Sequence, residues 1–438
     1  MEAAIDMPGR KAAFLELELA IEHARTTGHH MLVALVDMDR FYRLNETKGN
    51  DFGNYVLGVI ANRLCEAGAT LSGGLFNETS RFGGDCFQIV IAFHEQELVR
   101  VTHVLEAIKF AVERPIADGE QELYLTSSIG ASLYPKDGLT SEQLLCHAEL
   151  ALYRSKESGG NRVEVYSSED TVQMNRKITI ESSLRPALVQ RQFHLSYQPV
   201  YQLDNGRLRG YEALIRWQHP ELGNVSPEEF IPIAEFNGLI VPLGEWVLRE
   251  VCRRLSDMLR YEGLDHLRIS INISSQQLIS PSFVSTVINV VDEYELKAES
   301  LELEISERRM ALHDIQQVAE ALSELHAAGV RIVLDDFGKG YSSYTSLKYL
   351  PIHSVKIDKS FVKDIDLGGA DRYIVESMIQ LARRLGLEAI AKGVEFEEQM
   401  LLLKEWGCHY VQGYLLGKPM DPTQLDASVF RRTVENDG

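Results

Sequence analysis

The sequence has few cysteines and no long apolar segment. Its five cysteines stand far apart, and none belongs to a C-x-x-C pair. This spacing excludes a disulfide framework and a zinc site of the usual kind, and it favours reduced thiols in the cytoplasm. No run of about 18 apolar residues occurs, and the first residues do not resemble a signal peptide. We therefore expect a cytoplasmic protein without a membrane span.

Basic residues are also scarce. Lys and Arg number 44 against 64 Asp and Glu, so the formal net charge is −20. Binding to nucleic acid or to an anionic membrane depends on basic patches, and the composition argues against both. If the substrate is a phosphate ester, a metal ion is the usual means of offsetting such an acidic field.

The length of the chain predicts two domains. Hydrophobic residues make up 45% and charged residues 25% of the 438 residues, which is typical of globular proteins. A polar run at 167–170 marks the best boundary, and helical spacing from 171 to 188 predicts a connecting helix. We divide the chain into a first domain at 1–168, a connecting helix at 169–188 and a second domain at 189–432.

The first domain alternates helix and strand around one hairpin. Two crossover helices over a mixed sheet are typical of a ferredoxin-like, cyclase-palm α+β domain. The patterns predict helices at 11–25, 52–66, 98–112 and 141–155, strands at 31–36 and 123–133, and a hairpin at 81–92.

The second domain repeats strand and helix in a regular way. This alternation over about 240 residues favours a TIM-like (β/α)8 barrel. Few residues separate the first two strands, so we expect them to be antiparallel or irregular. Strands are predicted at 195–200, 209–216, 267–273, 300–305, 330–334, 355–357, 388–391 and 410–415.

Polar side chains stand at the ends of these otherwise apolar strands. Burying an unpaired charge costs several kcal/mol, so such groups must meet one another, a metal ion or a ligand. In a barrel they converge on the mouth at the carboxyl ends of the strands. A single strand-end acid is more often a cap or half of an ion pair, but recurrence over many strands argues for one common site. The residues are Glu212, Asn272, Glu304, Asp335, Asp336, Lys356, Glu395 and Gln412.

The donor types in this set indicate a magnesium or manganese site. Carboxylates and an Asn amide are hard oxygen ligands, which suit Mg²⁺ or Mn²⁺ better than zinc. The adjacent Asp335 and Asp336 allow one carboxylate to bridge two ions while its neighbour serves the second. Two metal ions about 3.5–4 Å apart are the usual clamp for phosphodiester hydrolysis.

The second domain resembles the EAL domain of bacterial cyclic-di-GMP phosphodiesterases over nearly all of residues 190–425. Taken together, the matching motifs are highly specific, and they imply a barrel that binds cyclic-di-GMP with Mg²⁺ or Mn²⁺. They are YQPV at 197–200, EALIRW at 212–217, NIS at 272–274, LEISE at 303–307, DDFG at 335–338, KID at 356–358, GVE at 393–395 and QGY at 412–414.

The resemblance implies a set of metal ligands. Glu212, Asn272, Glu304 and Asp335 would hold a first metal ion. Asp335 and Asp336 would face a second ion.

The resemblance also implies roles around the substrate. Lys356 would position the attacking water or a phosphate, and Arg216 would contact a phosphate through its guanidinium, the alternative being a surface salt bridge. Glu307 would anchor the loop 336–343, which in this family couples dimerisation to the active site, so we expect a homodimer. The remaining residues implied at the substrate or metal site are Gln198, Asp358, Glu395 and Gln412.

Two lysines depart from the family pattern. The family reads A-E-G-V-E where this chain reads A-K-G-V-E at 391–395, so Lys392 replaces a glutamate expected at the second metal ion. A unit-charge pair at about 4 Å is worth roughly 4 kcal/mol at an effective dielectric near 20, so a cation there would repel a metal ion. Three outcomes for Lys392 are open: the side chain swings away, it loses its proton, or it pairs with Asp336 or Glu395 and stands in for the second metal ion. Lys339 is the second departure, because it stands in a loop that usually reads D-F-G-T-G. The bland interpretation of Lys339 is a lysine side chain that is simply solvated.

Three functions stay open on this sequence. The first is a fully active Mg²⁺- or Mn²⁺-dependent phosphodiesterase, and the second is a cyclic-di-GMP-binding protein with weak or lost hydrolysis to linear pGpG. The third is a structural protein that binds no nucleotide, and the retained motifs argue against it. Lys392 favours the second function.

The first domain resembles the GGDEF domain of diguanylate cyclases over residues 10–166. The motifs are VDMDRF at 36–41, RFGGDCF at 81–87 and ALYRSK at 151–156. Four residues depart from the family pattern: Cys86 and Asn54 each replace an acid, Tyr42 replaces a lysine, and Gly160 replaces an arginine. We therefore expect a degenerate domain used for packing, dimerisation or regulation, without cyclase activity and with GTP binding left open. The implied GTP and metal residues are Asp37, Asn45, Gly83, Gly84 and Asp85.

Overall fold

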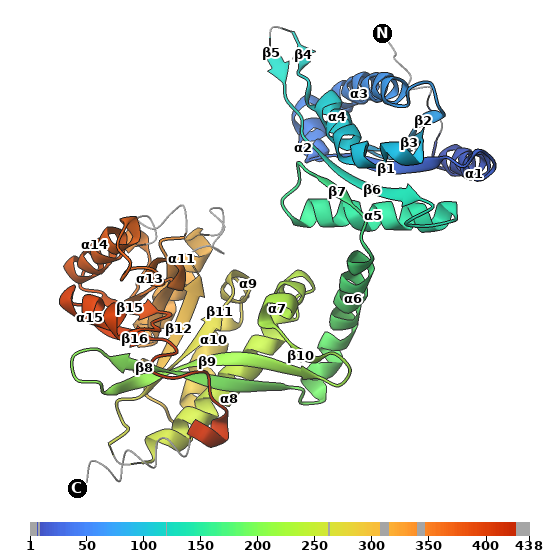
Figure 1. Ribbon diagram of the computed structural model, residues 1–438. Helices are drawn as coiled ribbons and strands as arrows, with labels where there is room; N and C mark the ends of the chain where they lie inside the picture. Colours follow the sequence, from blue (N-terminus) through green and yellow to red (C-terminus); the bar gives the residue numbers. More distant parts are fainter. Residues whose placement is uncertain are drawn as a thin grey trace. The chain divides into compact units, whose positions relative to one another are not determined.

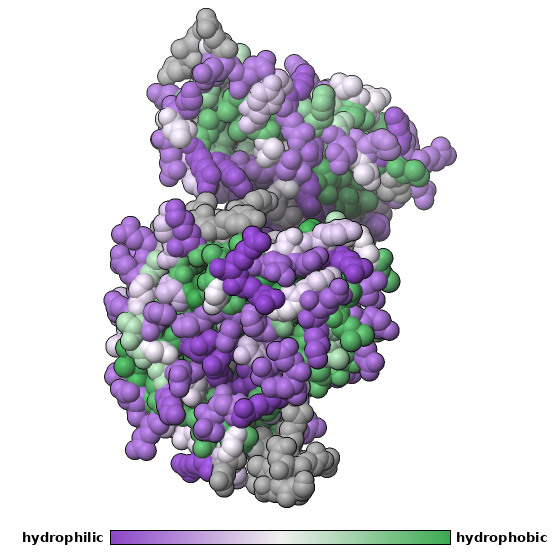
Figure 2. All heavy atoms as spheres, turned by 90° about the vertical axis from the view of Figure 1, so that its left-hand side faces the viewer, coloured by the Kyte–Doolittle hydropathy of each residue, from purple (hydrophilic) through white to green (hydrophobic). Residues whose placement is uncertain are grey.

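The computed structural model describes residues 7, 9–119, 121–261, 263–306, 315–339 and 347–425. Contacts divide the chain into two units, Met1–Ile178 and Thr179–Gly438, which are drawn in Figure 1. Charged and polar residues cover most of the face shown in Figure 2, with apolar residues in scattered patches. Within the described residues, no helix is long and apolar enough to cross a membrane.

The first unit is a mixed sheet between two pairs of helices. The strand order is β2-β3-β1-β6-β7, with β1 antiparallel to β3 and β6, and β6 parallel to β7. The elements are α1 (Arg10–Thr27), β1 (His30–Met38), α2 (Phe41–Lys48), α3 (Asn50–Leu71), β2 (Asn77–Gly83), β3 (Cys86–Phe93), η1 (Glu95–Arg100), α4 (Val101–Glu113), β4 (Ile116–Asp118), β5 (Gln121–Leu123), β6 (Ser127–Tyr134), α5 (Ser141–Glu157) and β7 (Val163–Val165).

Both faces of the central strand β1 are buried, which explains its continuous apolar sequence. Leu32 and Val36 belong to the cluster that includes α3 and α4. Met31 and Val33 point the other way, into the cluster formed with α1 and α5. Successive strand side chains alternate between faces, so one run of apolar residues supplies both cores. This is the α+β palm arrangement predicted from the sequence.

Some predicted boundaries in this unit were wrong. The strand predicted at 123–133 is two strands, because β5 pairs with β4 in a separate hairpin and only β6 joins the main sheet. The helix predicted at 98–112 begins as the 3-10 turn η1 and becomes α4 at Val101. The short helix α2 was not predicted.

The second unit begins within the helix α6, which crosses the division between the units. Its helices lie outside a ring of strands (Figure 1). The elements are α6 (Ser168–Val189), β8 (Phe193–Gln202), β9 (Leu208–His219), β10 (Gly223–Val225), α7 (Pro227–Phe236), α8 (Ile240–Leu259), β11 (Arg268–Ile273), α9 (Ser275–Leu278), α10 (Phe283–Glu293), η2 (Ala298–Ser300), β12 (Leu301–Ser306), α11 (Ile315–Ala327), β13 (Arg331–Phe337), β14 (Ser354–Ile357), α13 (Lys359–Val362), α14 (Ala370–Arg384), β15 (Glu388–Lys392), α15 (Glu397–Glu405) and β16 (Tyr410–Gln412).

Eight strands of the second unit close into a barrel. Strands β9, β11, β12, β13, β14, β15 and β16 pair in parallel, in chain order. Strand β8 closes the ring, because it pairs antiparallel with both β16 and β9. The structure confirms the TIM-like barrel and the antiparallel first pair.

One strand of the barrel is shorter than predicted. Strand β16 ends at Gln412 rather than at residue 415. Gly413 packs so closely on Val394 that an added Cβ atom would lie 2.0 Å from the Val394 carbonyl oxygen. The backbone turns at this contact, and Leu415 donates its N–H to the same carbonyl.

A buried ion-pair network occupies the amino-terminal ends of the barrel strands. Arg209 donates to both Glu302 carboxylate oxygens at 2.7 Å and to Glu388 at 2.9 Å. Arg331 also donates to Glu388, at 2.9 Å. Although burial opposes its ionisation, Arg209 and Arg331 lower the pKa of Glu388 from 4.5 to about 2. This network closes the floor of the barrel, opposite the mouth.

We predict that Glu388→Gln lowers the free energy of unfolding of the barrel by about 2–3 kcal/mol at pH 7. The pKa of Glu388 is lowered on folding, so its contribution is complete above pH 4.5 and is lost as the pH falls towards 2. The difference between variant and wild type should therefore shrink over this range.

Urea unfolding followed by tryptophan fluorescence measures this difference, because Trp217, Trp246 and Trp406 all lie in the second unit. The exposed Glu324→Gln on α11 is the matched control and should change little. A pH-independent difference between Glu388→Gln and wild type would contradict the assignment.

Candidate functional site

Two glutamates from different strands share one buried lysine at the mouth. The Lys356 ammonium donates to Glu212 at 2.8 Å and also to Glu304. Burial raises the pKa of both carboxyls, but Lys356 and Lys392 lower that of Glu212 to about 2. Burial and the Glu212 carboxylate raise the pKa of Glu304 to about 8. One lysine therefore does not fully offset two buried carboxylates.

Amide groups complete the surroundings of Glu212. Asn272 donates to one of its carboxylate oxygens at 2.9 Å, and Gln412 donates to the other at 2.8 Å. Gln412 also donates to the Gln198 side chain at 3.2 Å. Within the described chain, Glu304 Oε2 and Gln412 Oε1 are buried and have no hydrogen-bond partner. The site therefore presents acceptor oxygens that a ligand or cation would satisfy.

A bulge in β13 turns two adjacent aspartates towards the same group. The pairing of β13 with β14 shifts register between Leu334 and Phe337. Asp336 lies in the left-handed region at a φ of 54°, a conformation that costs about 1–3 kcal/mol for a residue other than glycine. In a regular strand, Asp335 and Asp336 would point to opposite faces.

The group that both aspartates meet is Lys392. Its ammonium lies 2.5 Å from Asp335 Oδ1 and 3.2 Å from Asp336 Oδ1. Burial opposes its charge, but Asp335, Glu212 and Asp336 raise the pKa of Lys392 above its usual value. Three outcomes for Lys392 were left open by the sequence, and the structure shows the ion pair with Asp336. Asp335 is an additional partner that was not predicted. Glu395 is exposed, and its backbone N–H donates a hydrogen bond to the Gln399 side-chain oxygen at 2.8 Å.

The donor set suits one metal position better than two. In the described ranges, no three or more His, Cys, Asp or Glu side chains form a ready metal site, and two ammonium groups lie between the carboxylates. Glu212, Asn272, Glu304 and Asp335 nevertheless offer hard oxygen donors, including the unpartnered Glu304 Oε2. At Asp336 the residues do not fit a second ion, because Lys392 already holds the facing oxygens.

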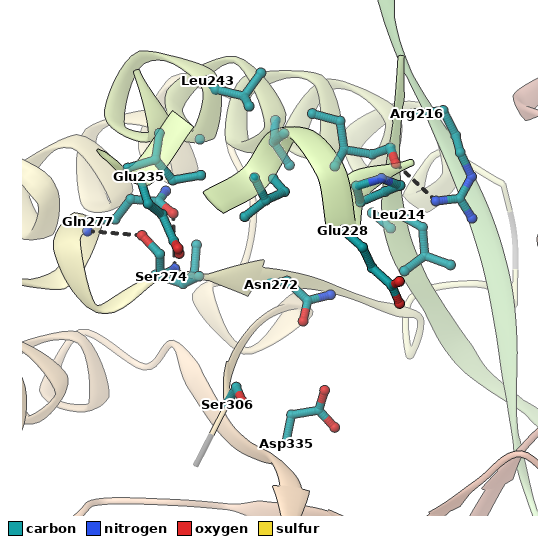
Figure 3. A pocket seen from close by; sticks show the side chains of 18 of the residues that line it. Leu214, Arg216, Glu228, Glu235, Leu243, Asn272, Ser274, Gln277, Ser306 and Asp335 are labelled. Carbon is teal, nitrogen blue, oxygen red and sulfur yellow. Dashed lines mark hydrogen bonds between the residues drawn. The ribbon is translucent and has the colours of Figure 1, made fainter. Parts of the chain in front are cut away.

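A pocket of about 240 Å³ opens beside these carboxylates (Figure 3). Asn272 and Asp335 lie at one end, and Arg216 lies at its side. The opposite wall comes from α7 and α8, and it combines apolar side chains such as Ile231 and Leu243 with the α7 residues Glu228 and Glu235. This wall was not predicted from the sequence.

A helix-start signal in the sequence marks the position of that wall. Ser226 and Glu229 form a capping box at the start of α7, with Pro227 in its first turn. These residues fix where α7 begins beside the mouth.

Arg216 is not in a surface salt bridge within the described residues. It is half-buried, and it donates to the Ile215 carbonyl at 2.9 Å. Burial lowers the pKa of Arg216. The guanidinium retains further N–H donors at the edge of the pocket.

The second unusual lysine is also paired. Lys339 lies 2.8 Å from Asp358 Oδ1, and Asp358 caps α13 by accepting the Ser360 N–H at 2.7 Å. Although burial opposes it, the contacts with Lys339 and Ser360 hold the pKa of Asp358 well below its usual range. Lys339 is therefore not a freely solvated loop residue. Glu307 and residues 340–346 lie outside the described residues, so the predicted loop anchor has no structural description.

The implied site of the first unit is partly brought together. Lys156 lies 2.6 Å from Asp37 Oδ1, and burial is the main cause that raises the pKa of Asp37, with Asp85 among the charges that add to it. Gly84 at the hairpin turn has a φ of 57°. Asn45, on α2, packs against Gly53.

A carboxylate near this site was missed by the sequence analysis. Asp39 accepts hydrogen bonds from Thr126 at 2.8 Å, Ser128 at 2.6 Å and the Asn161 N–H at 2.9 Å. Its place within the VDMDRF motif, two residues after Asp37, was the available signal. The thiol of Cys86 is mostly buried, which raises its pKa to about 12.

Comparison with known families matches both units. Residues 181–419, more than half of the chain, match the EAL domain family, and residues 4–162 match the GGDEF domain of diguanylate cyclases. The chain is a tandem GGDEF–EAL protein. A solved structure described as the PaMucR phosphodiesterase in complex with c-di-GMP is 41% identical, with a TM-score of 0.54. It covers 56% of this chain, which in turn covers 99% of that chain.

Two relatives from Pseudomonas aeruginosa match both domains of this GGDEF–EAL protein. The cyclic di-GMP phosphodiesterase NbdA is 35% identical over 407 residues, which are 93% of this chain and 51% of NbdA. The bifunctional diguanylate cyclase/cyclic di-GMP phosphodiesterase MucR is 35% identical over 423 residues, which are 97% of this chain and 60% of MucR. The chain thus spans about half to three-fifths of the length of these relatives.

Proposed function

We propose that this chain acts in cyclic-di-GMP signalling, by binding cyclic-di-GMP at the mouth of its EAL barrel and hydrolysing it to linear pGpG slowly or not at all. The observation that carries the proposal is the contact of Lys392 with both Asp335 and Asp336. The relatives NbdA and MucR, described as cyclic-di-GMP phosphodiesterases, support the choice of nucleotide.

The pocket beside the carboxylates supports nucleotide binding. Ile231 and Leu243 in its wall suit a base, and Arg216 at its side suits a phosphate. A divalent ion bound by Glu212 and its neighbouring oxygens would supply a Lewis acid for a phosphoryl oxygen. Lys356, on β14, holds Glu212 and Glu304 in place by donating hydrogen bonds to both carboxylates.

Lys392 explains the proposed loss of hydrolysis. Activation of water in a two-metal site needs a second cation beside the first. The Lys392 ammonium carries positive charge to that place, but it is not a Lewis acid and would not lower the pKa of a water molecule as a bound metal ion would. Asp335 and Asp336 are also engaged as its acceptors. A fully active phosphodiesterase is the alternative, and it requires Lys392 to leave both aspartates.

We predict that wild-type protein forms pGpG slowly with either Mg²⁺ or Mn²⁺, and that Lys392→Glu raises the rate on the order of 100-fold or more. The glutamate removes the ammonium and restores a carboxylate at the end of β15. Chromatographic measurement of pGpG formation tests this.

Lys404→Glu is the matched control, because it makes the same charge change at an exposed position on α15. It should leave the rate unchanged. Wild-type turnover equal to that of Lys392→Glu would establish the fully active alternative.

We predict that wild-type protein binds cyclic-di-GMP and that Arg216→Ala weakens binding by about 10–100-fold. A hydrogen bond to a charged group contributes about 1.5–3 kcal/mol, and 1.4 kcal/mol is a factor of ten. Isothermal titration calorimetry measures the affinities. Arg249→Ala, which removes an exposed arginine paired with Glu245, is the control. Absence of binding by the wild type would favour the purely structural function.

For the first unit, we propose a regulatory or packing role without cyclase activity. Lys156 already pairs with Asp37, and Cys86 stands beside it in place of an acid. We predict that the chain incubated with GTP and Mg²⁺ yields no cyclic-di-GMP, with an active diguanylate cyclase assayed in parallel. Formation of the product would contradict this role.

A further inference from the structure

The mouth of the barrel has an unusual balance of charge. Four carboxylates, those of Glu212, Glu304, Asp335 and Asp336, meet two ammonium groups, those of Lys356 and Lys392. With all six groups ionised, the net charge is minus two, which a single divalent cation would balance. A glutamate at position 392 would give five carboxylates and one ammonium, and two divalent cations would then be needed.

The positions of the two ammonium groups decide where a cation fits. Lys392 contacts Asp335 and Asp336, so a metal ion bridging these aspartates would lie within a few ångströms of a positive charge. One unit-charge pair at about 4 Å is worth roughly 4 kcal/mol at an effective dielectric of 20, and a divalent ion doubles the repulsion. The second metal position is therefore closed while Lys392 holds its contacts.

The other side of the mouth keeps open donor oxygens beside Lys356, because Lys356 contacts Glu304 through Oε1 only. Glu304 is fully buried, and its Oε2 has no partner among the described residues. Asn272 uses its amide nitrogen on Glu212, which leaves its oxygen for a ligand. In Figure 3, Asn272 and Asp335 lie at the same end of the pocket. A cation at this position would supply the partner that the buried Glu304 Oε2 lacks among the described residues.

We propose that this barrel takes one divalent cation where two would otherwise bind, with the Lys392 ammonium as a permanent substitute for the second. The proposal rests on the proposed function, and it specifies the cofactor of the same site. A tethered ammonium does not dissociate, so the second positive charge is present at any concentration of free metal. Cyclic-di-GMP binding then depends on the occupancy of a single ion.

The test counts Mn²⁺ ions bound to the full chain by native mass spectrometry and by calorimetry. We expect Lys392→Glu to bind one more ion per chain than the wild type. Its affinity for that ion should exceed any second-ion affinity of the wild-type barrel on the order of 100-fold or more. Because the readout is a difference between variants, ions held elsewhere, including at Asp37, cancel.

Control variants separate this proposal from its alternatives. Lys404→Glu makes the same charge change on the surface and should bind as many ions as the wild type. Should Lys392→Glu fail to fold, Lys392→Met also removes the ammonium and should again gain an ion at higher Mn²⁺ concentration. Equal ion counts for wild type and both Lys392 variants would overturn the proposal, even if hydrolysis were slow. Fast wild-type turnover with one ion would instead overturn only the proposed function.

Discussion

The pairing of lysine with carboxylate inside the barrel mouth is the interaction on which the site depends. Four carboxylates from three strands converge where water is largely excluded, and like charges at such distances repel strongly. Lys356 between Glu212 and Glu304, and Lys392 between Asp335 and Asp336, make that convergence tolerable. Among the described residues, Glu304 Oε2 is still buried without a hydrogen-bond partner, so the pairing is incomplete. The site is thus built to receive positive charge, but less of it than its carboxylates alone would suggest.

The two ends of the barrel solve the same electrostatic problem differently. At the floor, both oxygens of Glu302 accept hydrogen bonds from Arg209, so this carboxylate has its counter-charge within the protein, and the atom of the pair left without a partner among the described residues is a donor, Arg209 Nε. At the mouth, Glu304 Oε2 and Gln412 Oε1 are buried without partners among the described residues. One end pairs its carboxylates with arginines, and the other leaves acceptor oxygens without partners in the described part of the chain. This division between a stabilising end and a binding end is expected of a TIM-like barrel. The bulge at Asp336, where φ is 54°, adds local backbone strain at the open end.

The sequence predicted the barrel and most of the convergent residues, because strand periodicity and strand-end polar residues are local signals. It did not predict partner choice, which depends on the register of strands distant in sequence. Pairing of Lys392 with Asp336 or Glu395 was one of three outcomes left open by the sequence, and the shortest contact of Lys392 is to Asp335 on β13. The pairing of Lys339 with Asp358 and the pocket wall from α7 and α8 depend on tertiary packing in the same way. The prediction of a single strand at 123–133 was wrong, because periodicity does not say which strand a segment pairs with.

The central claim is that Lys392 occupies the place of a cation between Asp335 and Asp336. The most direct measurement is a crystal structure of the full chain grown with Mn²⁺ and cyclic-di-GMP, with anomalous scattering recorded at the manganese edge. The account predicts one manganese peak near Glu212, Asn272 and Glu304, with the Lys392 ammonium still in contact with both aspartates. Two manganese peaks, with Lys392 turned away from the aspartates, would contradict it.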